Sequence, residues 1–199
     1  MPPKNRQKTK NIQRIEPAPP ASVRERLLDT ADRLFYREGV RAVGIDRVLA
    51  EAGAAKASLY SHFGCKDDLV AAHVERRITD ARARIEAYVA DIPPAERALR
   101  FFDLVVEWAK SPDFRGCPLH HVVVELSDPK HPARAVAAKQ RQWMHARFFE
   151  WVRAAGAPNP AAAAGALVVL FDGAVTASEH DGPQRARDAR WMAGQLLSH

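Results

Sequence analysis

The sequence predicts an all-α fold in which a three-helix N-terminal unit precedes a larger helical body. Apolar residues recur every three or four positions along the chain, as in Leu27, Ala31, Leu34 and Phe35, and this spacing places them on one helical face. Glycine and proline separate such segments, where they end helices. No credible strand pattern occurs. With 47% apolar residues, the 199-residue chain can form a substantial core.

The N-terminal unit carries clear helix-boundary signals. Ser22 and Glu25 form a capping box at the start of the first helix, and Gly39 has the position of a C′ glycine at its end. Two short helices are expected next, at residues 45–52 and 56–63, with Gly53 and Gly64 as their breaks. Leu59 and Phe63, four positions apart, form the inward face of the third helix.

Proline and glycine divide the rest of the chain into six more helices. We expect them at about residues 66–90, 95–110, 119–126, 133–155 and 160–179, with a last helix ending near residue 197. Asp67 and Asp68 lie in the first turn of the long helix from Lys66, where negative charge suits the helix dipole.

The excess positive charge lies in the N-terminal third. Residues 1–66 contain 13 Lys or Arg and 7 Asp or Glu, whereas residues 67–199 contain 17 of each. This distribution favours a polyanion-binding head on a neutral body, with a merely solvated basic surface as the alternative. Residues 1–21 combine basic residues with prolines and lack periodicity. They are expected to form a disordered basic arm that either touches DNA or has no specific role.

The second and third helices, joined by a tight turn, have the layout of a helix-turn-helix, which places its second helix in the major groove of DNA. Lys56 can reach a guanine edge or a phosphate, and Tyr60, His62 and Lys66 suit phosphates. Packing of Tyr60 and a capping role of His62 are the alternatives. The predicted DNA-binding residues are Arg47, Lys56, Ala57, Ser58, Tyr60, Ser61, His62 and Lys66.

Two blocks of this unit carry a family likeness. They are Ile45…Val48-Leu49-Ala50-Glu51-Ala52-Gly53 and Lys56-Ala57-Ser58-Leu59-Tyr60-Ser61-His62-Phe63 followed by Lys66-Asp67-Asp68-Leu69. The segment at 23–70 resembles the tetracycline-repressor (TetR) family of transcriptional regulators. The resemblance implies a dimeric protein whose head, residues 22–66, binds a palindromic operator. It also implies that residues 67–199 form a ligand-binding and dimerisation domain.

Four positions depart from the family pattern. Gly44, Ala55 and Cys65 stand where hydroxyl side chains are usual, and Ala57 replaces a common glycine. The missing hydroxyls would cap helices or touch phosphate. We therefore expect operator affinity to depend more on Lys56, Tyr60, Lys66 and the basic arm.

The neutral body is rich in aromatic and aliphatic residues, so a pocket within it would suit an apolar or aromatic ligand. Most of the candidate residues are more often plain core, and about a third of them are expected to touch a ligand. The predicted ligand-binding residues are Phe102, Val105, Trp108, His120, Val124, Trp143, Arg147, Phe148 and Trp151. The spacing of Cys117, His120, His121 and Glu125 would also permit zinc or copper. Without a second paired motif, we expect no metal and no cofactor.

Small and apolar residues in the last two helices predict a homodimer. One stripe is Ala162, Gly165, Ala166, Val169, Gly173 and Ala177, and the other is Ala186, Ala189, Ala193, Leu196 and Leu197. Two such helices from each subunit would form a four-helix bundle, unless they pack within one chain. A dimer would set two recognition helices about 34 Å apart, one turn of DNA.

These features predict a DNA-binding protein with a pocket for a small apolar or aromatic ligand. The resemblance implies a sequence-specific transcriptional regulator, a repressor that the ligand releases from a palindromic operator. The alternatives are a non-specific nucleic-acid-binding module without a ligand and a metal-responsive regulator. An enzyme is not expected, because no phosphate-binding glycine loop, nucleophile elbow or zinc-protease signature occurs. Two cysteines, no signal peptide and no apolar run of 18 residues favour a cytoplasmic protein without a membrane partner.

Overall fold

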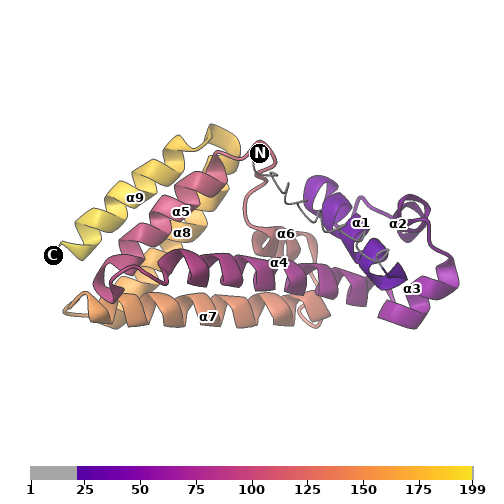
Figure 1. Cartoon of the computed structure of the whole chain (residues 1–199), viewed down its shortest axis with the longest axis horizontal. Coiled ribbons are helices and arrows are strands. Elements are labelled where there is room, and N and C mark those ends of the chain that lie inside the picture. The colour runs from indigo at the N-terminus through magenta and orange to yellow at the C-terminus, as the bar shows by residue number, and fades with distance from the viewer. Residues whose placement is uncertain (1–21, 199) are drawn as a thin grey trace, which may run out of the picture.

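The computed structural model describes residues 22–198, so the expected basic arm at 1–21 lies outside the described residues. The described chain is helical and contains no strand, which confirms the all-α prediction (Figure 1). Its elements are α1 (Val23–Glu38), α2 (Ile45–Ala52), α3 (Lys56–Phe63), α4 (Lys66–Val89), a 3-10 turn (Pro94–Glu96), α5 (Arg97–Ala109), α6 (Pro118–Glu125), α7 (Pro132–Ala154), α8 (Pro160–Asp181) and α9 (Gln184–Leu197).

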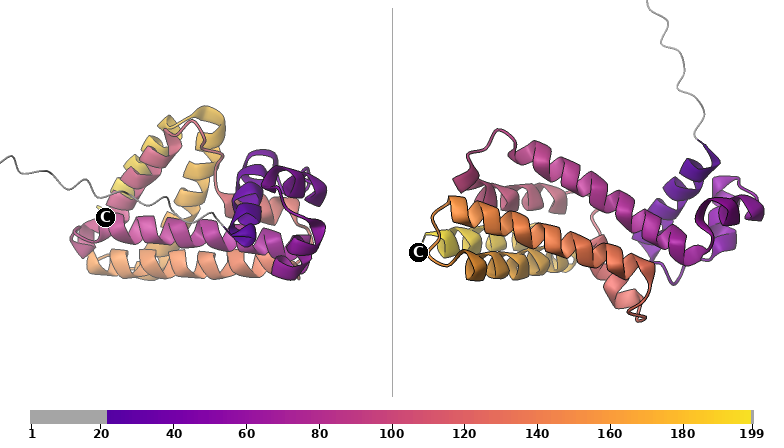
Figure 2. Two further views of the ribbon diagram at one scale, coloured as in Figure 1. Left: turned by 45° about the vertical axis from the view of Figure 1, so that its right-hand side comes forward. Right: turned by 90° about the horizontal axis from the view of Figure 1, so that it is seen from below.

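Helices α1, α2 and α3 form a small head at one end of the molecule (Figures 1 and 2). Leu34, Val48 and Leu59 of these three helices are buried in its core. The head core does not stop at α3, because the first half of α4 and one residue of α6 also belong to it. These additional residues are Leu69, Val70, Val74, Ile78 and Val122.

A second core lies in the body, between the last part of α4 and helices α5, α7, α8 and α9. Its centre is aromatic: the ring centroids of Phe101 and Phe148 lie 5.2 Å apart, edge to face. Helices α4 and α7 run side by side along the length of the molecule (Figure 2). Ile85 and Val89 of α4 are buried in the body, so this one helix contributes to both cores.

Helix α8 is the one described helix that is long and apolar enough to cross a membrane. It packs against α7 and α9, and four of its apolar side chains, Leu167, Val168, Ala174 and Val175, are buried. The apolar composition of α8 is therefore accounted for in part by packing within the fold.

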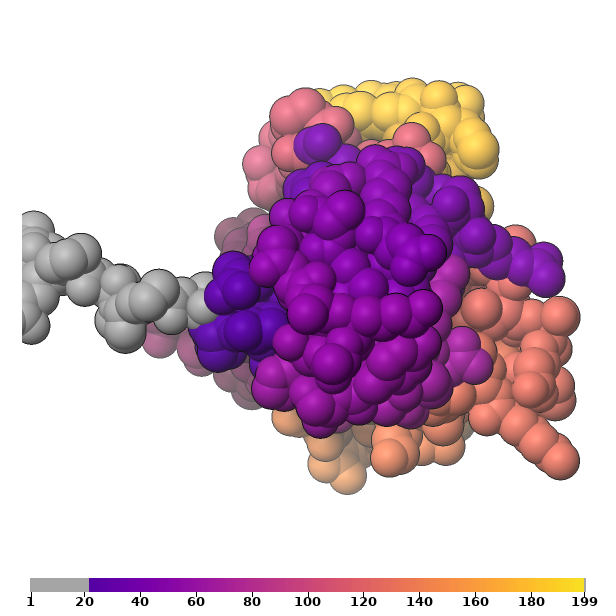
Figure 3. All heavy atoms as spheres, turned by 90° about the vertical axis from the view of Figure 1, so that its right-hand side faces the viewer, coloured from indigo at the N-terminus to yellow at the C-terminus, as the bar shows by residue number. Residues whose placement is uncertain are grey.

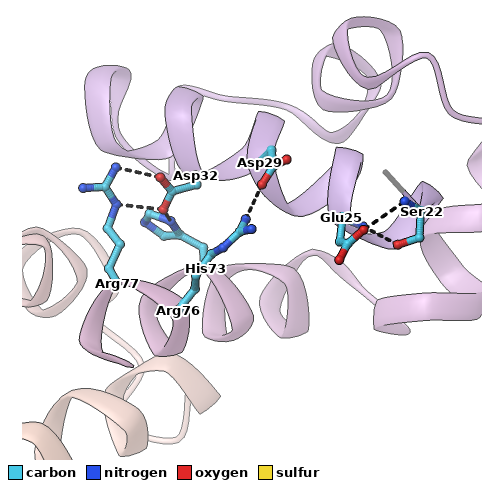
Figure 4. Close-up of polar contacts among 7 residues, drawn as sticks. All are labelled: Ser22, Glu25, Asp29, Asp32, His73, Arg76 and Arg77. Carbon is cyan, nitrogen blue, oxygen red and sulfur yellow. Dashed lines mark hydrogen bonds and ion pairs between the residues drawn. The ribbon is translucent and has the colours of Figure 1, made fainter. Parts of the chain in front are cut away.

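A polar junction fixes α1 to the middle of α4 (Figure 4). The Asp32 carboxylate accepts hydrogen bonds from Arg77 Nε and Nη2, each at 2.8 Å, and from His73 Nδ1 at 2.8 Å. His73 is buried, and the side chains of Asp32 and Arg77 are each 25% exposed. Burial acts to raise the pKa of Asp32, but the hydrogen bonds from His73 and Arg77 outweigh it and hold that pKa below its ordinary value.

Asp32→Asn tests this junction. We expect the free energy of unfolding at pH 7 to fall by about 2 kcal/mol, because hydrogen bonds to charged groups contribute about 1.5–3 kcal/mol. A lowered pKa in the folded state means that the carboxylate stabilises the fold above the ordinary pKa of about 4. That stabilisation is lost as the pH falls through the lowered pKa. Urea unfolding at neutral and acidic pH should therefore show the difference between wild type and variant shrinking in acid.

Asp29→Asn is the matched control. Asp29 also pairs with an α4 arginine, Arg76, but its side chain is 58% exposed (Figure 4). Exposed ion pairs contribute little, so we expect a loss below about 1 kcal/mol. Equal losses in the two variants would contradict a special role for Asp32.

Candidate functional site

Helix α3 presents a polar face on the head. Its two apolar residues, Leu59 and Phe63, are buried in the head core and fix which side of the helix faces outward. Tyr60 is 51% exposed. The other predicted contact residues on this helix are exposed or half-buried, namely Lys56, Ala57, Ser58, Ser61 and His62. Figure 3 views the molecule from this end, where the head covers most of the face.

Arg47 and Lys66, also predicted to bind DNA, have partners inside the head. Arg47 donates from Nε to Glu51 at 2.9 Å and from Nη2 to Glu38 at 2.8 Å, and these bonds raise its pKa. Lys66 Nζ donates to the carbonyl oxygen of Val40 at 2.8 Å, and partial burial lowers the pKa of Lys66. In this structure Arg47 and Lys66 stabilise the head. To contact DNA, each must exchange these hydrogen bonds for bonds to the DNA.

The departures at Gly44, Ala55 and Cys65 all fall at N-cap positions. These residues are the N-caps of α2, α3 and α4, and none of their side chains accepts a backbone N–H. Cys65 Sγ instead donates to Asp68 Oδ2 at 3.1 Å. First-turn N–H groups of α3 therefore lack a side-chain cap at the entry to the predicted recognition helix.

Ala55→Ser should restore such a cap. We expect the free energy of unfolding to rise by about 1 kcal/mol, because a serine N-cap accepts a first-turn N–H that alanine leaves without a partner. Thermal unfolding measures the gain, and gel-shift titration should show operator binding retained or tightened. Ala57→Ser, inside α3, offers no cap and should give no gain. A large loss of operator affinity in Ala55→Ser would contradict this interpretation.

A cavity of about 1430 Å³ lies where the head meets the body. Helices α1, α4, α5, α6, α7 and α8 all contribute to its wall. The apolar lining includes Ile78, Ile85, Leu104, Trp108, Phe114, Met144 and Phe171. The charged lining includes Asp32, Arg77, Arg84, Arg141 and Asp172. This volume exceeds the roughly 300–1,000 Å³ of most small-molecule sites, but the apolar wall with a few polar groups is typical of them.

Two of the nine predicted ligand-binding residues, Trp108 and His120, line this cavity. Four others lie instead in the aromatic body core, where Phe102, Val105 and Phe148 are fully buried and Trp151 is 3% exposed. The spacing of these residues indicated correctly that they are buried. They are buried against protein, however, and not against the cavity.

The remaining three predicted ligand residues lie near the surface, outside the cavity lining. Trp143 has the guanidinium groups of Arg82 and Arg147 over its ring, at 5.0 and 5.6 Å from the centroid. Arg147 pairs with Glu86 at 2.8 Å and with Glu150 at 2.6 Å. Val124 is 67% exposed. Contrary to the prediction, the packing of the fold thus leaves these three residues outside the cavity lining.

The possible metal ligands do not converge. No group of three or more His, Cys, Asp or Glu side chains suited to a metal occurs within residues 22–198. Glu125 accepts the backbone N–H of Arg41 at 2.9 Å, and His121 Nε2 lies 3.5 Å from Glu179. Burial raises the pKa of the Cys117 thiol, which disfavours the thiolate that binds metals.

The two predicted dimer stripes have different environments. On α8, Ala162, Ala166, Val169 and Gly173 are exposed. On α9, Ala186, Ala189 and Ala193 are buried in the chain's own body core, which corrects the prediction for these three. Leu196 of the same predicted stripe is exposed, and so are Trp191 and Met192, which the prediction did not include.

Tyr36 of the head forms part of the cavity wall, and the sequence did not predict this role. The Tyr36 hydroxyl accepts the backbone N–H of Arg115 at 2.9 Å and donates to the carbonyl oxygen of Gly116 at 3.3 Å. The Arg77 guanidinium lies 3.7 Å from the centroid of its ring. Tyr36, Asp32 and Arg77 all line the cavity. No local signal marked them, because they come from segments that meet only in the fold.

Comparison with known sequences supports the architecture. The family model described as bacterial regulatory proteins, tetR family, matches residues 27–73. The HTH-type transcriptional regulator LmrA of Bacillus subtilis is 30% identical over 131 residues, which cover 64% of this chain and 66% of that protein. The HTH-type transcriptional repressor DhaR of a Mycobacterium species is 26% identical over 107 residues, covering 53% of this chain and 52% of that protein. The matches thus span about half to two thirds of these curated relatives.

Solved structures match over a longer range. A TetR-family transcriptional regulator from Streptomyces coelicolor is 36% identical with a TM-score of 0.84, and the match covers 88% of this chain and 94% of that chain. A TetR-type regulator from Streptomyces avermitilis is 34% identical with a TM-score of 0.81, covering 89% and 97% respectively. The chain described above therefore belongs to the TetR family of bacterial transcriptional regulators.

Proposed function

We propose that the protein is a homodimeric repressor that binds a palindromic operator through α3 and leaves it when a small apolar or aromatic molecule fills the cavity. The observation that carries this proposal is the position of the cavity, whose wall includes residues of the head itself. A ligand there contacts the DNA-binding unit directly. As a regulator of transcription, the protein is expected to act in the cytoplasm.

Recognition of DNA is assigned to the outward face of α3. Lys56 lies in the first turn of this helix and is exposed, so it can approach base edges or phosphates. Tyr60 and His62 lie farther along the exposed side and suit the phosphate backbone. The basic residues of segment 1–21 would add contacts that do not depend on sequence.

Lys56→Ala tests this assignment. Genomic footprinting first identifies the operator: a discrete palindrome supports the proposal, whereas uniform coating supports the non-specific alternative. On that operator, the variant should bind more weakly. If Lys56 contacts a phosphate, the slope of log affinity against log salt concentration should also fall by about 1, because one fewer counterion is released.

Lys139→Ala is the control for Lys56→Ala. Lys139 is an exposed lysine of α7, in the body, so its replacement removes the same charge far from α3. We expect unchanged operator affinity and salt slope. Equal weakening by both variants would show a general charge effect and contradict a contact by Lys56.

Dimerisation is assigned to the outer faces of α8 and α9. Val169 is 68% exposed, Trp191 61% and Met192 49%, which is unusual for large apolar side chains in one chain. Small residues beside Val169, such as Ala166 and Gly173, allow a close approach of helices. A twofold pair of these faces forms a four-helix bundle.

Coupling between cavity and head is assigned to Tyr36 and the Asp32 junction. Tyr36 joins α1 to the Arg115–Gly116 backbone, and Asp32 joins α1 to α4. Glu125 of α6 adds a third attachment through the backbone N–H of Arg41. A ligand that disturbs these contacts changes the orientation of the head, and with it the spacing of the two recognition helices.

Tyr36→Phe keeps the ring beneath Arg77 but removes both hydrogen bonds of the hydroxyl. We expect about fivefold weaker operator binding by fluorescence anisotropy, because the loss of a hydrogen bond contributes about 1 kcal/mol. Tyr88→Phe is the control, since Tyr88 is a half-buried α4 tyrosine packed against the body core. Unchanged operator affinity in Tyr36→Phe would overturn the coupling role of Tyr36.

A further inference from the structure

Arg84 is a cavity-lining cation without a carboxylate partner. Among residues 22–198 its one described contact is with Trp108, whose ring centroid lies 5.7 Å from the Arg84 guanidinium carbon. Both side chains line the cavity. Arg84 is exposed, and it lies two helical turns beyond Arg77 on the same side of α4.

The other charges of the lining are mostly neutralised. Four of its five carboxylates are paired with a cation, in the pairs Asp32–Arg77, Asp113–Arg37, Glu107–Lys110 and Asp172–Arg141. The fifth, Asp80, is exposed and has no described partner. Arg134 donates to the carbonyl oxygens of Val123 and Leu126, so its charge is also not balanced by a carboxylate. Two cations and one carboxylate thus remain, and the cavity has a positive excess.

The wall around Arg84 is apolar and aromatic. Ile85 follows it on α4, and Trp108, Met144 and Phe171 line the same cavity. Flat rings pack well against such side chains. A guanidinium group beside an aromatic wall favours a ligand that combines rings with an oxyanionic group, because arginine binds two oxygens of such a group through two parallel hydrogen bonds.

We propose that the effector of this protein is an aromatic oxyanion, with its acidic group bound by Arg84 and its rings packed beside Trp108. This inference rests on the proposed function and names the chemical class of its ligand. A neutral aromatic compound leaves the Arg84 charge without a partner. A cationic one meets Arg84 as a like charge and has only the exposed Asp80 to bind it.

A matched pair of fluorescent probes tests the charge. Anilinonaphthalene sulfonate is an aromatic anion, and phenylnaphthylamine has the same rings without the sulfonate. We expect the anion to bind the wild-type protein about tenfold more tightly in fluorescence titrations, because only the anion forms charge-assisted hydrogen bonds with Arg84. Equal or tighter binding of the neutral probe would overturn the proposal.

Two variants locate the anion. Arg84→Gln should weaken binding of the anionic probe about tenfold and leave the neutral probe within about twofold, because only a charge-assisted bond is lost. Arg153→Gln, at an exposed arginine of α7, should change neither probe. If Arg84→Gln weakened both probes equally, or neither, Arg84 would not be the anion-binding residue.

Ala81→Phe tests whether the probes occupy this cavity. Ala81 lines the cavity one turn before Ile85, so a phenyl ring there should reduce binding of both probes. Unchanged binding of the anionic probe would place its site elsewhere and overturn the proposal.

Operator binding is measured separately, so that a failure of the anionic-ligand proposal can be told apart from a failure of the proposed function. A protein that binds a discrete palindrome but prefers the neutral probe retains the proposed function and loses only the anionic ligand. A protein that prefers the anion through Arg84 but coats DNA uniformly loses the proposed function instead.

Discussion

The attachment of Asp32 to the middle of α4 is the interaction on which the rest of the structure depends. Helix α4 has 24 residues and is therefore about 36 Å long. Leu69 and Val74 anchor its first half in the head, and Ile85 and Val89 anchor its second half in the body. Because Asp32 binds His73 and Arg77 in the half of α4 that is anchored in the head, α1 must follow any tilt of α4. Head position and body packing thus cannot change independently.

Helix boundaries were predictable because their causes are local. The capping box of Ser22 and Glu25 is present, and Gly39 follows the last residue of α1. The outward face of α3 was also predictable, because the four-residue spacing of Leu59 and Phe63 fixes its buried side. Each of these signals lies within one turn of the residue it governs, so the sequence alone carries it.

The cavity was not predictable in the same way. Apolar spacing shows that Phe148 is buried, but it does not show whether a ligand or another helix covers it. Likewise, small residues such as Ala189 permit the close approach of another helix but do not show which helix it is. Here that helix belongs to the same chain. Tyr36 and Arg77 lie 41 positions apart in sequence and meet only after the head has docked on α4. Nothing near either residue marks that contact.

The position of the cavity supports the proposed regulation by a ligand, because polar contacts between head and body lie in its wall. The aromatic residues at the centre of the body core, such as Phe101 and Phe148, do not line the cavity, whereas other members of that core, such as Ile85 and Met144, form part of its wall. The cavity lies where the head meets the body, and there hydrogen bonds of Tyr36, Asp32 and Glu125 add to the apolar contacts that the head makes with α4 and α6. Coupling between allosteric sites is typically about 1–3 kcal/mol, which is comparable to the contribution of two or three hydrogen bonds. Under the proposed function, a ligand that exchanges these hydrogen bonds would change the orientation of the head while the two cores remain folded.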